Sequence, residues 1–116
     1  MTQLNLTKQQ DELWYAYKLN PNSDNYNIAV SYRVRGNFDK EKFKSIYLTI
    51  GNHFEAFRAQ FIENDGEAAQ IICDHFDGEL IYQALNDANE QKALDTIEAL
   101  RAKPFNLEKD WLFRAI

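Results

Sequence analysis

Apolar residues recur at helical spacing in the middle of the chain, and the period then changes to two. The helical stripe consists of Phe43, Ile46, Tyr47, Ile50 and Phe54. Past Ala56, the residues Phe57, Ala59 and Phe61 alternate with their neighbours, as on a strand. Asp39 can cap the helix, and Phe38 can pack on Phe43 as a hydrophobic staple. The pattern therefore predicts a buried helix that runs straight into a strand.

Two further helices are predicted, one near each end of the chain. Thr7 and Gln10 have the T-x-x-Q pattern of a capping box, so the first helix is expected from about Lys8 to Leu19. Its apolar face comprises Leu13, Trp14 and Tyr17.

The last helix is expected from about Glu90 to Ala102, with Asp87 or Asn89 as its cap. It must end before Pro104, which lacks the backbone N–H that a helix needs. The side chains expected on its buried face are Ala93, Leu94, Ile97 and Leu100.

Strand patterns occupy much of the remaining chain. Tyr26 to Arg35 alternates, with Ile28, Val30, Tyr32 and Val34 on its apolar side. Asp65-Gly66 predicts a hairpin turn followed by a strand over about Ala68 to Asp74. Short strands are predicted at Leu80 to Tyr82 and from Trp111 to Ile116. The order of elements indicates an α/β (α+β) fold with a mixed sheet and packed helices.

Length and charge bound the class of protein. The chain has 116 residues, 45% of them hydrophobic, and a net charge of −5, which fits one globular domain. Acidic and basic residues are interspersed, so no basic cluster is available to bind nucleic acid or an anionic membrane. The sequence has no apolar run long enough for a membrane span and no secretory signal pattern. Cys73 is the only cysteine, which favours a cytoplasmic location and excludes an internal disulfide.

The residues by themselves predict no active site, cofactor or metal. The glycines are isolated, so no phosphate-binding loop is present. His53 and His75 lie in different elements without ligands at a known spacing, and surface histidines are the simpler interpretation. Glu55 and Arg58 are three residues apart at the junction of helix and strand, where a local ion pair is expected.

Four short motifs, in order along the chain, resemble those of the condensation domains of nonribosomal peptide synthetases. Residues 6–14 are similar to L-T-x-x-Q-x-x-x-W, with Gln10 and Trp14 in place, and residues 19–21 and 26–28 to L-[DN]-P and Y-N-[IV]. Residues 53–61 resemble R-H-E-x-L-R-T-x-F and keep Glu55, Arg58 and Phe61. Residues 65–70 match D-G-x-x-x-Q, and residues 104–115 are similar to P-F-[DN]-L-x-x-x-x-L-x-R-A.

The resemblance implies a chloramphenicol-acetyltransferase-like fold of two subdomains around a tunnel. Such domains join a carrier-bound acyl or peptidyl thioester to a carrier-bound amine, both held on phosphopantetheine arms. The family's H-H-x-x-x-D-G motif supplies a histidine that positions or deprotonates the amine, and this motif does not occur among the 116 residues. Arg58 corresponds to an arginine that braces the catalytic loop by pairing with its aspartate. Epimerisation and heterocyclisation domains share much of this pattern.

These resemblances define our expectations. Residues 1–116 are expected to be the N-terminal portion of a condensation-type domain, ending before the catalytic motif and inactive alone. No residue is assigned a catalytic role, and five are expected to support the site structurally: Arg58, Glu55, Phe61, Gln10 and Trp14. The expected partners are the remainder of the domain and a peptidyl carrier protein, and no cofactor is expected on the chain itself.

Two expectations complete this set. The alternative function is a stand-alone condensation-like docking module that binds a carrier protein or a synthetase. In addition, the apolar segment from Trp111 to Ile116 is expected to expose a sheet edge, through which the chain would self-associate.

Overall fold

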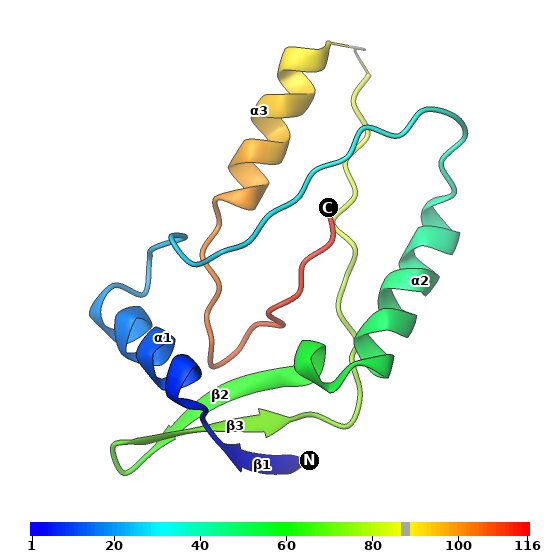
Figure 1. Cartoon of the computed structure of the whole chain (residues 1–116). Helices are drawn as coiled ribbons and strands as arrows, with labels where there is room; N and C mark the ends of the chain where they lie inside the picture. Colours follow the sequence, from blue (N-terminus) through cyan, green and yellow to red (C-terminus); the bar gives the residue numbers. More distant parts are fainter. Residues whose placement is uncertain (87–88) are drawn as a thin grey trace.

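A small sheet lies at one end of the molecule, and three helices extend from it around a central opening (Figure 1). The computed structural model describes residues 1–86 and 89–116. In these residues the elements are β1 Thr2–Asn5, α1 Lys8–Leu19, α2 Lys40–His53, η1 Glu55–Arg58, β2 Ala59–Asn64, β3 Glu67–Ile72 and α3 Glu90–Arg101. The predicted α/β class is confirmed.

The three strands pair antiparallel in the order β1-β3-β2. The predicted hairpin is confirmed, because Asp65 (φ 52°) and Gly66 (φ 82°) form the two-residue turn between β2 and β3. A parallel pair, the other component of a mixed sheet, is not found among the strands described. Strand β1 was not predicted, because all four of its residues are exposed and give no alternating signal.

Helices α1 and α3 occur where the sequence predicts them. Thr7 and Gln10 form the reciprocal capping box of α1, and the side chain of Asn89 caps α3 by accepting hydrogen bonds from Gln91 N and Lys92 N. Asp87, the other candidate cap, lies outside the described residues. The buried face predicted for α3 is wrong, because no residue of α3 is fully buried and Leu94 is 51% exposed.

Helix α2 begins as predicted, but its burial and its end differ from the prediction. Asp39 accepts a hydrogen bond from Lys42 N, and the rings of Phe38 and Phe43 lie 5.4 Å apart. The helix does not run straight into a strand, because Phe54 is extended and the 3-10 turn η1 follows it. Within the apolar stripe only Tyr47 is buried, so the prediction of a buried helix was also wrong.

Three predicted strands are absent from the described residues: Tyr26 to Arg35, Leu80 to Tyr82, and Trp111 to Ile116. Alternation sets which face a side chain would occupy, but a strand also needs a neighbour to complete its hydrogen-bonded ladder. A single backbone bond, from Ile81 N to Ala115 O (3.0 Å), joins the second and third of these segments. The first crosses the molecule as an unpaired trace between α1 and α2 (Figure 1).

The core centres on Phe76, which is fully buried. Its ring lies against Gly51 and Gly78, where an added Cβ would be 2.1 Å and 2.4 Å from ring atoms. Three aromatic rings surround it at centroid distances of 5.0 to 6.1 Å, those of Tyr47, Trp111 and Phe113. Among the described helices, none combines the length and the apolar character needed to cross a membrane.

Candidate functional site

Arg58 joins the end of α2 to the end of β3. Its Nε donates to the carbonyl of Cys73 (2.8 Å), and its Nη1 donates to the carbonyls of Asn52 (2.5 Å) and Gly51 (3.4 Å). The last carbonyls of a helix have no partner within the helix and carry partial negative charge, so a guanidinium is well suited to them. Cys73 N in turn donates to Arg58 O (2.9 Å), which fixes the backbone at the same place.

Glu55 does not take part in this junction. It is exposed at the start of η1. The ion pair predicted between Glu55 and Arg58 does not form among the described residues, because the guanidinium is directed at backbone carbonyls instead. Proximity in sequence was therefore a poor guide to the partner of Arg58.

Asn52 extends the junction to Phe76, and sequence reasoning did not single it out. Its Oδ1 accepts from Phe76 N (2.8 Å), and its Nδ2 donates to Phe76 O (2.9 Å) and to Leu48 O (2.9 Å). The side-chain amide thus pairs with the backbone of Phe76 as a neighbouring strand would. Because the Asn52 carbonyl also binds Arg58, one residue links the buried ring to the arginine.

Gln10 and Gln70, from two of the motifs, meet across the sheet. Gln70 Nε2 donates to Gln10 Oε1 (3.0 Å) and to the carbonyl of Asn5 (3.2 Å). The same Gln10 oxygen accepts from Thr7 N (2.9 Å) in the capping box. Gln70 is buried, so these bonds satisfy polar atoms that would otherwise be costly to bury.

Trp14 and Phe61, which also belong to two different motifs, pack together. Their ring centroids are 6.4 Å apart, and Trp14 is buried. Lys18 lies over the Trp14 ring at 5.0 Å and pairs with Glu63 at 2.8 Å. The hydrogen bond from Lys18 to Glu63 raises the pKa of the exposed Lys18 amine. Helix α1 is therefore held on β2 by stacking and charge together.

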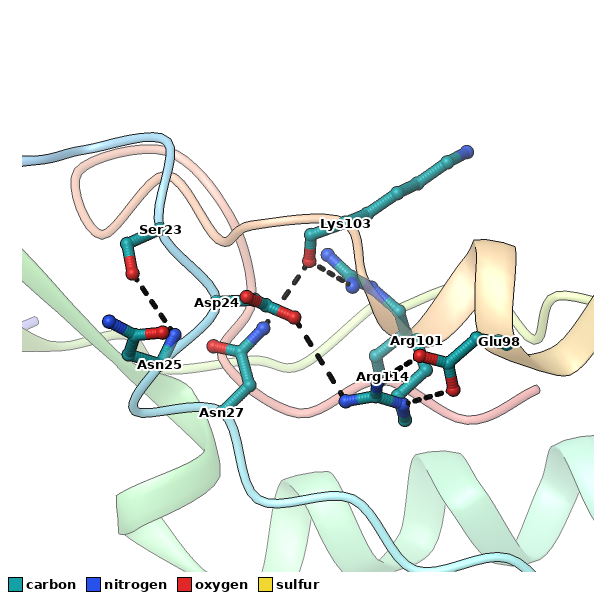
Figure 2. Close-up of polar contacts among 8 residues, drawn as sticks. All are labelled: Ser23, Asp24, Asn25, Asn27, Glu98, Arg101, Lys103 and Arg114. Carbon is teal, nitrogen blue, oxygen red and sulfur yellow. Dashed lines mark hydrogen bonds and ion pairs between the residues drawn. The ribbon is translucent and has the colours of Figure 1, made fainter.

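A fourth junction forms at the carbonyl of Lys103, just beyond α3 (Figure 2). Arg114 Nη1 donates to this oxygen at 2.9 Å, and Asn27 Nδ2 donates to it at 3.4 Å. Arg101 binds Glu98 and lies 4.0 Å from Asp24 in the loop after α1. The Arg101 hydrogen bond holds the pKa of the Glu98 carboxyl below its usual value. Segments from three regions of the sequence therefore converge on one backbone oxygen.

Tyr47 is the buried titratable group next to the core. Its hydroxyl donates to the carbonyl of Phe113 at 2.6 Å. Burial raises the pKa of this phenol above its ordinary value, because the charged phenolate is poorly solvated there.

The chemistry that these contacts support is structural. Within residues 1–86 and 89–116, no group of three or more His, Cys, Asp or Glu side chains is placed to hold a metal ion. The motif residues instead bind one another or the backbone, as Gln10 does with Gln70, Trp14 with Phe61 and Arg58 with Asn52. Arg58 retains one terminal nitrogen, Nη2, that makes no hydrogen bond with the described residues.

Solved structures share this arrangement. The starter condensation domain of rhizomide synthetase RzmA superposes with a TM-score of 0.78 at 27% identity, covering 98% of this chain and 28% of that one. The four-domain nonribosomal peptide synthetase holo-AB3403 gives a TM-score of 0.84 at 22% identity, covering 98% and 9% of the two chains. The second likeness, at its lower identity, concerns the fold alone.

Sequence relatives agree with the fold. The Condensation domain family matches residues 1–116, and the chain belongs to this family. A linear gramicidin synthase protein of Brevibacillus parabrevis is 36% identical over 115 residues, which are 95% of this chain and 2% of that protein. Bacitracin synthase 3 of Bacillus licheniformis is 32% identical over 111 residues, with the same two coverages. The chain thus spans a small part of the length of these synthetases.

Proposed function

We propose that this chain is the N-terminal portion of a condensation domain that, in full, forms an amide bond. The complete domain joins an acyl or peptidyl thioester on one carrier protein to an amine on another. The observation that carries the proposal is the family match over residues 1–116, together with the mutual contacts of the motif residues. The identity of the joined units is set outside these residues.

In this proposal Arg58 is a positioning residue. Its Nε and Nη1 are held by carbonyls at the ends of α2 and β3, which fixes the plane of the guanidinium. Nη2 then remains for a carboxylate, and the aspartate of an H-H-x-x-x-D-G loop is the group that the family resemblance suggests. Such a charge-assisted bond would brace the catalytic loop from the side of this subdomain.

The proposed partners follow from the same chemistry. The remainder of the domain covers the apolar opening between α1, α3 and the 26–35 segment. Peptidyl carrier proteins deliver both substrates on phosphopantetheine arms, so no cofactor need reside on this chain. A reducing, cytoplasmic setting suits the lone thiol of Cys73.

The genomic reading frame after the codon for Ile116 tests this proposal. An open frame that continues into H-H-x-x-x-D-G would support a condensation domain. A stop codon directly after Ile116 would contradict it.

A stand-alone docking module for a carrier protein is the second candidate, and the surface of α2 favours it. Phe43, Ile46 and Phe54 are 39%, 50% and 52% exposed. Exposed apolar side chains along one helix are typical of a surface that binds a partner. Titration of the chain with a carrier protein, followed by calorimetry, would separate the two candidates if Ile46→Lys abolished binding and Glu41→Lys did not.

A further inference from the structure

Residues 26–35 are held beside α3 by their two ends. Asn27 Nδ2 donates to the carbonyl of Lys103 beyond the end of α3 (Figure 2), and Arg33 forms an ion pair with Glu90 at its start. Six residues of extended chain and thirteen residues of helix each span about 20 Å, so the two anchors match in length. The segment is therefore kept straight without a ladder of hydrogen bonds.

The other side of this segment is open. Both anchors use odd-numbered residues, and in an extended chain the even-numbered side chains point the opposite way. These side chains are 66% to 96% exposed, and they are Tyr26, Ile28, Val30, Tyr32 and Val34. No backbone group of residues 28–35 forms a backbone hydrogen bond with the part of the chain that the structure describes. A straight, apolar and unpaired strand is a template for another strand.

We propose that the 26–35 segment pairs antiparallel with the same segment of a second copy of this chain, about a two-fold axis at Val30. In this register Ile28 faces Tyr32 of the other copy and Tyr26 faces Val34, which are favourable pairs of an aromatic with a β-branched residue. An isologous contact of this kind closes a dimer and leaves no further edge of the same kind to extend it.

Charge supports the same register. Arg33 lies opposite Asn27 and Arg35 opposite Asn25, so no arginine opposes another across the axis. A register centred on Ser31 would instead place Tyr26 opposite Gly36 and lose one of the two aromatic pairs. The pairing thus uses this segment in place of the terminal edge at Trp111–Ile116. There Trp111 and Phe113 already pack on Phe76, and Trp111 donates to Asp77 at 3.0 Å.

Sedimentation velocity over about a hundredfold range of concentration tests whether the dimer exists. The wild-type chain is expected to shift from monomer to dimer. Val30→Lys, which opposes two ammonium groups on the axis, is expected to weaken the dimer at least tenfold. Ser31→Lys is the matched control, because the added charge faces Ala29 and should change the dissociation constant by less than threefold. Circular dichroism checks that both variants keep their helices.

Disulfide trapping in a Cys73→Ser background tests the register. Val30→Cys is expected to cross-link on mild oxidation, since directly paired residues have Cα atoms about 4.5 to 5.5 Å apart. Ser31→Cys is expected to cross-link at least tenfold more slowly. Equal rates, or faster trapping of Ser31→Cys, would overturn the register. A monomer at every concentration would overturn the dimer and leave the remainder of a condensation domain as the occupant of this face.

Discussion

Gln70 donates a side-chain hydrogen bond to Gln10 at 3.0 Å, although the two residues are 60 positions apart in the sequence. The acceptor oxygen is also part of the capping box of α1, where it binds Thr7 N. One buried amide therefore couples the start of the first helix to the central strand of the sheet. This coupling explains why the motif residues of the family matter in a chain without a catalytic histidine pair.

Gln70→Ala is expected to lower the free energy of unfolding by about 1 to 3 kcal/mol, because it leaves the Asn5 carbonyl and the Gln10 amide without a partner. Gln10→Ala should cost about 1 kcal/mol through loss of the cap. The double variant should cost less than the sum by at least about 0.5 kcal/mol. Urea unfolding measures all three, with the exposed Gln9→Ala as a control. Strictly additive effects would show that the two amides act independently.

Gly51→Ala is expected to destabilise the fold, although alanine favours helices by about 1 kcal/mol over glycine. The added Cβ would lie 2.1 Å from Phe76 Cδ1, and the fully buried ring has no free space into which to move. Overpacking of this kind costs about 1 to 3 kcal/mol, which outweighs the helix preference. Ser45→Ala on the exposed side of α2 is the control. Thermal unfolding of Gly51→Ala at or above the wild-type midpoint would contradict the packing around Phe76.

Tyr47 should make the chain sensitive to alkali. Its pKa is raised in the fold by burial, so its contribution to stability is fully present below the pKa of the unfolded phenol, about 10. The contribution is lost as the pH rises through the folded pKa, because the unfolded state releases its proton first. Tyr47→Phe should cost about 1 kcal/mol at neutral pH through loss of the bond to Phe113 O.

The difference in unfolding free energy between the wild type and Tyr47→Phe isolates this effect from the other titrating groups. That difference should shrink between neutral pH and pH values above about 10. A constant difference over the same range would show that the Tyr47 hydroxyl is as well solvated in the fold as in the unfolded chain.

Arg58→Lys should destabilise the chain itself by about 1.5 to 3 kcal/mol, the range for hydrogen bonds to charged groups. An ammonium lacks the planar fork that reaches both Cys73 O and Asn52 O. Arg35→Lys, at an exposed position, is the matched control. If urea unfolding gave the same stability for Arg58→Lys and the wild type, the arginine would have no structural role within these residues.

Local signals in the sequence predicted local structure well. The capping box at Thr7, the Asp39 cap and the Asp65-Gly66 turn each depend on residues close in sequence, and all three are confirmed. Strand patterns were less informative, because pairing depends on a distant neighbour. Residues 26–35 have the period of a strand but no partner among the described residues, whereas Thr2–Asn5 has no such period and pairs with β3.

The long-range contacts of the candidate site could not be predicted in the same way. Phe76 stands alone between polar residues, so no periodicity marks it as the centre of the core. Asn52 reaches Phe76 and Arg58 through a side chain and a backbone carbonyl that carry no sequence signature. Resemblance to the family selected Gln10, Gln70, Trp14 and Phe61 as important, and the structure supplied the pairs that they form.

An assay of amide formation tests the central claim most directly. The chain would be incubated with a donor carrier protein loaded with an acyl or peptidyl thioester and an acceptor carrier loaded with an aminoacyl thioester. An intact condensation domain serves as the positive control. We predict that the chain alone forms no amide above the rate without protein, because it contains no H-H-x-x-x-D-G motif. Amide formation by the chain alone, at a rate that rises with its concentration, would contradict the account.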